Sequence, residues 1–223
     1  MAKDNLTPIN VKEYDSEIKS VIPYYEEFHK QTISVIKNMR FMEINWLDLG
    51  CGTGTLANKA KDVFPKGHFV MADPSEKMLE RARINNKTLK AKYLNCGSET
   101  IEFNNQFNIV TTIQAHHYLQ MDVRKKATKN IYQALCLGGI YITFENVVPE
   151  SKEITSFELQ RWGMYQQEHG KSVNEVENHL SRCGVNYFPL SINEHIKLLK
   201  SIGFTLVHVF WYSFMQVGIY AIK

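Results

Sequence analysis

The chain has 223 residues, of which 44% are hydrophobic and 22% charged, and its formal net charge is +3. This composition excludes intrinsically disordered and fibrous classes, and the length suits one domain. The small net charge predicts no nucleic-acid partner, and no apolar run approaches the roughly 20 residues of a membrane-spanning helix. Four widely spaced cysteines form no CxxC pair, and the N-terminus lacks an apolar leader. We therefore expect a cytoplasmic, single-domain protein without a membrane partner.

The first two thirds of the chain alternate predicted helices and strands. Residues 11–39 have helical periodicity, which is interrupted near Pro23. We expect strands at residues 44–49, 68–72, 91–95, 107–113 and 140–144. Between them we expect helices at residues 55–64, 75–83 and 122–136. This alternation is typical of a parallel sheet covered by helices on both faces.

The pattern changes after the fifth predicted strand. Residues 149–189 contain no strand signal, and helices are predicted there at 154–169 and 173–183. Ser191 and Glu194 then form a capping box for a helix that ends at Gly203. Residues 204–212 and 216–222 predict a closing hairpin. The sequence thus indicates one α/β domain with a helical insert between its fifth and sixth strands.

The helix predicted at 122–136 carries a row of basic residues and is expected to end at Gly138 and Gly139. These are Arg124, Lys125, Lys126 and Lys129. We interpret the row as an exposed, solvated face of the helix, with RNA contact as the alternative.

The segment from Asp48 to Thr55 is glycine-rich and directly follows the first predicted strand. Gly50, Gly52 and Gly54 leave no Cβ where the loop turns, so a ligand can lie against bare backbone. The next helix begins there and points free N–H groups at the ligand. Asp73 ends the second strand, and in a parallel sheet its carboxylate lies beside the loop, where it can accept hydrogen bonds from both hydroxyls of a ribose.

Three nucleotide ligands compete for this loop. A Walker loop is excluded because Thr55 stands where Lys is needed. A dinucleotide remains an alternative, since residues 52–57 fit the GxGxxA pattern. Against it, Asp48 would face the pyrophosphate. The same carboxylate suits S-adenosylmethionine (SAM), which has an ammonium group and no phosphate.

The stretch from Trp46 to Thr55, with Asp73 after the second strand, resembles motifs I and II of class I SAM-dependent methyltransferases. The resemblance covers roughly residues 40–147. It implies a Rossmann-like seven-stranded, mostly parallel sheet with an antiparallel C-terminal hairpin, and SAM as the cofactor. It also implies these cofactor-binding residues: Tyr14, Asp48, Gly50, Cys51, Gly52, Gly54, Asp73, Pro74, Met78, Gly97, Ser98 and Gln114. Many members have Asp where this chain has the segment 95–98, so the adenine contact departs from the family pattern.

Candidates for the acceptor side come from the turn after strand four and from the insert. His116 and His117 follow that strand; the alternative is a helix start with one capping and one solvated histidine. Tyr165 and Arg182 lie in the insert and would bind a planar or anionic acceptor. No His or Cys spacing predicts a metal site. Aromatic residues of the last hairpin predict core packing or a homodimer face.

We expect a methyltransferase that acts on a small molecule. Residues 1–40 would form an N-terminal cap, 41–148 the SAM-binding core, 149–190 the substrate insert, and 191–223 the last helix and hairpin. The insert, followed by Phe204-Thr205-Leu206 and by residues 218–223, also resembles the carboxy-SAM synthase branch, whose members use SAM and prephenate to make carboxy-SAM for tRNA wobble-uridine modification. In that branch an arginine near Arg182 holds the new carboxylate. A SAM-binding partner subunit without catalysis is the third hypothesis.

Overall fold

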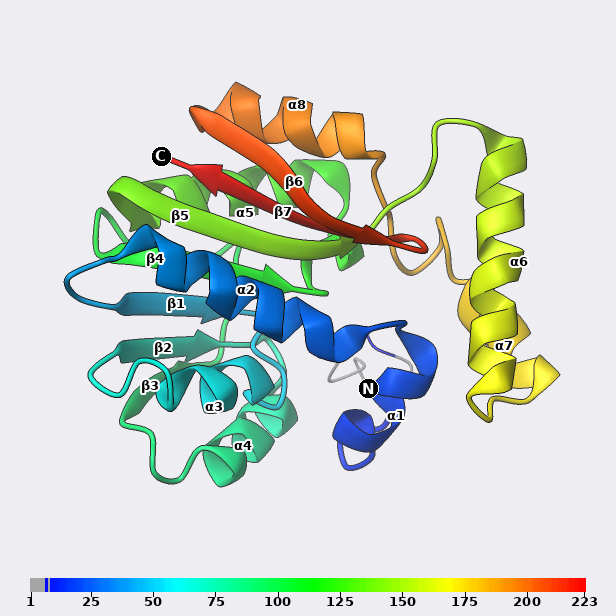
Figure 1. The fold of residues 1–223 in the computed structure, drawn as a ribbon, viewed down its shortest axis with the longest axis horizontal. Helices are drawn as coiled ribbons and strands as arrows, with labels where there is room; N and C mark the ends of the chain where they lie inside the picture. The colour runs from blue at the N-terminus through cyan, green and yellow to red at the C-terminus, as the bar shows by residue number, and fades with distance from the viewer. Residues whose placement is uncertain (1–6, 8) are drawn as a thin grey trace.

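The computed structural model describes residues 7 and 9–223, whose strands form one seven-stranded sheet (Figure 1). The spatial order is β3-β2-β1-β4-β5-β7-β6. The strands are β1 (Asn45–Leu49), β2 (His68–Ala72), β3 (Ala91–Leu94), β4 (Phe107–Ile113), β5 (Leu135–Asn146), β6 (Leu206–Ser213) and β7 (Gln216–Ile222). The first five are parallel, whereas β7 is antiparallel to both β5 and β6. The predicted fold class is confirmed.

The helices begin and end largely at the predicted signals. They are α1 (Tyr14–Val21), α2 (Tyr25–Met39), α3 (Thr55–Lys61), α4 (Glu76–Asn85), the short 3-10 helix η1 (His116–Tyr118), α5 (Met121–Ala134), α6 (Lys152–Glu168), α7 (Val173–Leu180) and α8 (Ile192–Ile202). Pro23 separates α1 from α2, and the Ser75 hydroxyl accepts a hydrogen bond from Met78 N at the start of α4. The capping box of Ser191 and Glu194 is present. None of the described helices is long and apolar enough to cross a membrane.

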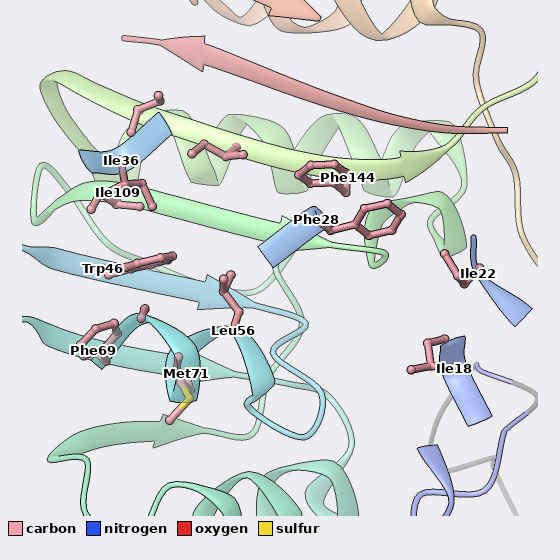
Figure 2. Close-up of a cluster of buried hydrophobic side chains, with 14 of the residues drawn as sticks. Ile18, Ile22, Phe28, Ile36, Trp46, Leu56, Phe69, Met71, Ile109 and Phe144 are labelled. Atoms are coloured by element: carbon pink, nitrogen blue, oxygen red, sulfur yellow. The ribbon is translucent and has the colours of Figure 1, made fainter. Parts of the chain in front are cut away.

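Alternate residues of the strands pack in two hydrophobic layers, one on each face of the sheet. Trp46 of β1 packs in the layer under α2 and α3, whereas its neighbour Leu47 packs in the layer under α5 and α8. Figure 2 shows the first layer, in which Phe28 of α2 lies over Phe144 of β5. Their rings stack at a centroid distance of 4.5 Å. Both faces are therefore buried, as parallel sheets require.

Two details of the predicted helix at 122–136 are wrong. The helix ends at Ala134, and both Gly138 and Gly139 lie inside β5. Arg124 is 1% exposed rather than solvated: its Nε donates to the His116 carbonyl at 3.0 Å, and Nη2 donates to the Phe188 carbonyl at 2.6 Å. The row of basic residues did not reveal this, because the carbonyls come from η1 and the end of the insert.

The insert stands beyond the carboxyl ends of the parallel strands, where α6 and α7 lie apart from the sheet and beside α1 (Figure 1). Trp162 of α6 is fully buried, and its Nε1 donates to the Val21 carbonyl at 2.6 Å. The Tyr165 hydroxyl donates to the Lys19 carbonyl at 2.8 Å. These two bonds join the insert to the N-terminal helix at the edge of the sheet where ligands bind in this kind of fold.

We expect Phe28→Ala to lower the free energy of unfolding by about 3–5 kcal/mol, because the ring is fully buried against Phe144 and Trp211. Urea denaturation followed by circular dichroism measures the change. Met42→Ala is the matched control, since Met42 is 99% exposed. Equal stability of the two variants would contradict the assignment of Phe28 to the core.

Candidate functional site

The glycine loop between β1 and α3 turns through backbone conformations that favour glycine. Gly50, Gly52 and Gly54 have φ values of +66°, +54° and +76°. A Cβ on Gly50 would also collide with the Ala115 side chain in the loop after β4. The three spaced glycines thus suit the turn, and Gly50 is also needed for the close approach of the loop after β4.

The carboxylate of Asp73 lies beside this loop, at the end of β2. Its Oδ2 accepts a hydrogen bond from Gly52 N at 2.9 Å, and its Oδ1 accepts one from Ser75 N at 2.8 Å. The side chain is buried. Each carboxylate oxygen can accept a further hydrogen bond, so Asp73 can hold the loop and a ligand hydroxyl together.

Asp48 is buried at the end of β1 and accepts a hydrogen bond from the Thr111 hydroxyl at 2.7 Å. Burial raises the pKa of Asp48 to about 7, and the nearby Asp73 carboxylate adds to the rise, while the Thr111 bond opposes it. A bound cation would favour the ionised form. Asp48 can therefore complement a positively charged ligand group.

One cavity of about 620 Å³ lies at the carboxyl edge of the sheet. The predicted residues that line it are Tyr14, Gly50, Gly52, Asp73, Pro74, Met78, Gly97, Ser98, Gln114, His116 and Arg182. Its opposite wall comes from α1, through Ile18 and Val21, and from the insert, through His179 and Tyr187. The structure thus brings most of the predicted site residues to a single space.

The remaining candidates lie elsewhere. Asp48 and Cys51 line a small adjoining space of about 20 Å³, and burial raises the pKa of the Cys51 thiol well above its usual range. Gly54 is the N-cap of α3. His117 and Tyr165 are not among the residues that line the large cavity. The Cys51 thiol stays protonated, as expected for a small packing residue in a loop.

The two histidines after β4 belong to a buried polar network, which corrects the alternative of a solvated histidine. His116 and His117 are 4% and 1% exposed. The His116 Nε2 lies 2.8 Å from the Ser98 hydroxyl, and the His117 Nδ1 lies 3.0 Å from Glu145 Oε2. Burial lowers the pKa of His116 to about 4. The network fixes the turn that forms one wall of the cavity.

Glu145 is the centre of this network. It accepts hydrogen bonds from the backbone N–H groups of His116 and His117, at 3.3 and 2.7 Å, and from the Thr143 hydroxyl at 2.7 Å. Burial alone would raise the pKa of Glu145, but the hydrogen bond and charge of His117 outweigh burial and hold it below its usual range. Glu145 is therefore an ionised, fully hydrogen-bonded carboxylate in the core.

Sequence reasoning missed several polar residues of the cavity wall, among them Glu99 and His179. Glu99 lies one position beyond the segment 95–98, in which an acid was sought, and its carboxylate folds over Gly97, close to the place where a Cβ would stand. His179 lies on α7, far along the chain from the strand ends. The position of Glu99 shortly after the third strand could have indicated its role, whereas no position in the sequence indicated that His179 reaches the cavity. Within the described part of the chain, no group of three or more His, Cys, Asp or Glu residues could hold a metal ion.

Comparison with known proteins agrees with this geometry. Residues 47–139 match the family model described as a methyltransferase domain. Among solved structures, the chain is similar in fold to the YcgJ protein of Bacillus subtilis (TM-score 0.65, 15% identity, covering 89% of this chain and 98% of that one). It is also similar to phosphoethanolamine N-methyltransferase 2 of Haemonchus contortus (TM-score 0.63, 16% identity, covering 96% and 57%). The chain is thus similar to SAM-dependent methyltransferases, in sequence over residues 47–139 and in the order of its strands, and this similarity supports SAM as the cofactor.

The chain is also similar to carboxy-S-adenosyl-L-methionine synthases. It is 25% identical to the enzyme of Nautilia profundicola, in an alignment of length 210 that covers 88% of this chain and 88% of that one. It is likewise 25% identical to the enzyme of Staphylococcus epidermidis, covering 95% of this chain and 92% of that one. The similarity therefore extends beyond the glycine loop and includes the insert and the hairpin.

We expect Glu145→Gln to lower the free energy of unfolding at pH 7 by about 1.5–3 kcal/mol, the range for hydrogen bonds to a charged group. The pKa of Glu145 in the folded protein is lowered to about 2, so its contribution is fully present above the unfolded value of about 4.3 and is lost progressively as the pH falls from there towards 2. Urea denaturation at pH 7 and at about pH 3 measures the loss, which should be smaller at the lower pH. The exposed Glu168→Gln is the control; an equally stable Glu145 variant would contradict the assignment.

Proposed function

We propose that this protein transfers a methyl group from SAM to a small-molecule acceptor. The observation that carries the proposal is the continuity of the cavity, which runs from the glycine loop to the wall built by α1 and the insert. Its volume of about 620 Å³ lies within the roughly 300–1,000 Å³ of small-molecule sites. Cofactor and acceptor would thus share one confined space, which favours a small acceptor over a macromolecule.

The residues of the sheet edge fit SAM part by part. The bare backbone at Gly50 and Gly52 suits its methionine portion, and the Asp48 carboxylate suits the ammonium group. Asp73 would accept hydrogen bonds from the ribose, and Glu99 could accept one from the amino group of adenine. The absence of Asp in the segment 95–98 is therefore compensated by an acid one residue further along the chain.

When bound, SAM supplies a methyl group that its sulfonium has already activated. The chain would then contribute mainly alignment of the acceptor and exclusion of water. The apolar side chains of Ile18, Val21 and Ile22 line the wall that α1 contributes. They exclude water from the space next to the cofactor, and Asn146 at the end of β5 offers an amide for orientation.

A carboxy-SAM synthase-like reaction is the second candidate. Two observations favour it: the relatives that bear this name match nearly the whole chain, and Arg182 lies on the cavity wall. A guanidinium binds a carboxylate through two parallel hydrogen bonds, so Arg182 suits a carboxylate on the acceptor or on the modified cofactor. Both candidates need the same SAM site and differ only in what lies against Arg182.

Titration calorimetry with SAM and S-adenosylhomocysteine tests the shared cofactor site. We expect Asp73→Ala to weaken binding by about 1.5–3 kcal/mol for each charged hydrogen bond lost. Asp62→Ala, on the exposed end of α3, is the matched control. Because Asp73 also holds Gly52, circular dichroism must show that the variant is folded. Failure of the unaltered protein to bind either compound at millimolar concentration would refute the proposal.

Mass spectrometry of the ligand extracted from purified protein separates the two candidate reactions. A methyltransferase should release SAM or S-adenosylhomocysteine. Carboxy-SAM synthesis predicts a compound that exceeds SAM by the mass of one carboxylate, and Arg182→Met should lose that compound while retaining S-adenosylhomocysteine binding.

A further inference from the structure

Asn146 is the last residue of β5, at the edge of the sheet that faces the insert (Figure 1). The residue is only 5% exposed, and it lines the large cavity. Its Oδ1 accepts a hydrogen bond from Gln216 Nε2 at 3.2 Å. Gln216 is fully buried on β7 and stands opposite Asn146 in the β5–β7 ladder. The Asn146 amide is therefore held in one orientation by a fixed neighbour.

The Nδ2 atom of Asn146 is the free end of this amide. It makes no hydrogen bond to any residue that the structure describes, yet it is not among the described unpartnered side-chain atoms that are enclosed by protein. Nδ2 therefore keeps accessible surface. Because the residue is otherwise buried and lines the cavity, this surface opens into the cavity. Two N–H donors are thus available to a bound molecule.

Other polar side chains of the same wall are paired or out of reach. The His116 Nε2 lies 2.8 Å from the Ser98 hydroxyl. His179 Nδ1 and the Tyr187 hydroxyl are unpartnered but enclosed by protein, so a molecule in the cavity cannot reach them. Small-molecule sites usually orient their ligands through a few polar groups placed in an apolar wall, and the Asn146 amide fits this description.

The position of Asn146 along the sheet edge separates it from the cofactor residues. Asp73, which would hold the ribose of SAM, ends β2, and both β1 and β4 lie between β2 and β5. Neighbouring strands are about 4.8 Å apart, so three such steps place these strand ends about 14 Å apart. A hydrogen bond spans only about 3 Å. Asn146 thus lies toward the insert, where the acceptor would bind, and away from the nucleoside.

We infer that Asn146 determines the class of acceptor, because its Nδ2–H groups bind a carbonyl or carboxylate oxygen of the molecule beside the cofactor. The inference rests on the proposed function and names the acceptor class for the same site. An amide N–H needs a lone pair, which such an oxygen supplies. An ammonium group offers only donors, so it would leave Nδ2 unpaired and would meet the positive charge of Arg182 on the same cavity wall. The site therefore selects oxygen-bearing acceptors against amines.

The test uses calorimetry on the complex of the protein with S-adenosylhomocysteine. The probes are panels of small aliphatic and aromatic carboxylates and ketones, together with amines of the same carbon skeletons. Asn146→Leu removes the donors at similar volume. Asn146→Asp keeps an oxygen for the bond from Gln216 but replaces the donors with an acceptor, so it decides the matter if the leucine variant fails to fold. Asn178→Leu, on the exposed face of α7 and away from the cavity wall, is the matched control.

We expect at least one carboxylate or ketone to bind the complex, about 10-fold or more weakly in Asn146→Leu, with S-adenosylhomocysteine binding unchanged. Asn146→Asp should lose the same probe and gain affinity for the matching amine. The control should bind the probe like the unaltered protein.

Equal affinity of the probe in Asn146→Leu, its retention in Asn146→Asp, or binding of amines alone would overturn the inference. So would a complex that binds none of the oxygen-bearing probes. Weaker S-adenosylhomocysteine binding in a folded Asn146→Leu variant would also overturn it, because Nδ2 would then face the cofactor. Failure of the unaltered protein to bind SAM and S-adenosylhomocysteine would instead refute the proposed function.

Discussion

The site depends on one carboxylate, that of Asp73. It binds Gly52 of the loop after β1 with one oxygen and Ser75 at the start of α4 with the other. Two successive strand-to-helix connections are thereby fixed to each other at the edge of the sheet. Gly50 can then approach Ala115 after β4, and the turn after β4 forms the next part of the cavity wall.

The glycine loop, the helix caps and the closing hairpin could be predicted from the sequence, because each depends on interactions between residues or strands that are close in the chain. The glycines are spaced by the turn that they make, the Ser75 and Ser191 caps lie within three residues of their partners, and Asp73 ends the strand next to the loop. The hairpin of β6 and β7 likewise connects neighbouring strands. Interactions of such short range can be recognised from the order of the residues alone.

The surroundings of several polar side chains could not be predicted, because the residues that bury these side chains lie far along the chain. Arg124 belongs to a basic row, yet it satisfies a carbonyl 64 positions away. The adjacent His116 and His117 diverge, since one meets Ser98 and the other meets Glu145, 28 positions away. The ring of His179 contacts those of Trp162 and Tyr187 only when the insert folds back on itself. No spacing rule connects such residues.

The hydrogen bond from Trp162 to Val21 has a consequence for the order in which the protein folds. Its partners are 141 positions apart, so the wall of α1 and the insert requires closure of a long loop. The contacts of the glycine loop with Asp73 span only 21 positions. Contacts of low sequence separation form sooner than those of high separation. A partly folded chain would therefore hold the glycine loop against Asp73 before it has the cavity wall that α1 and the insert build.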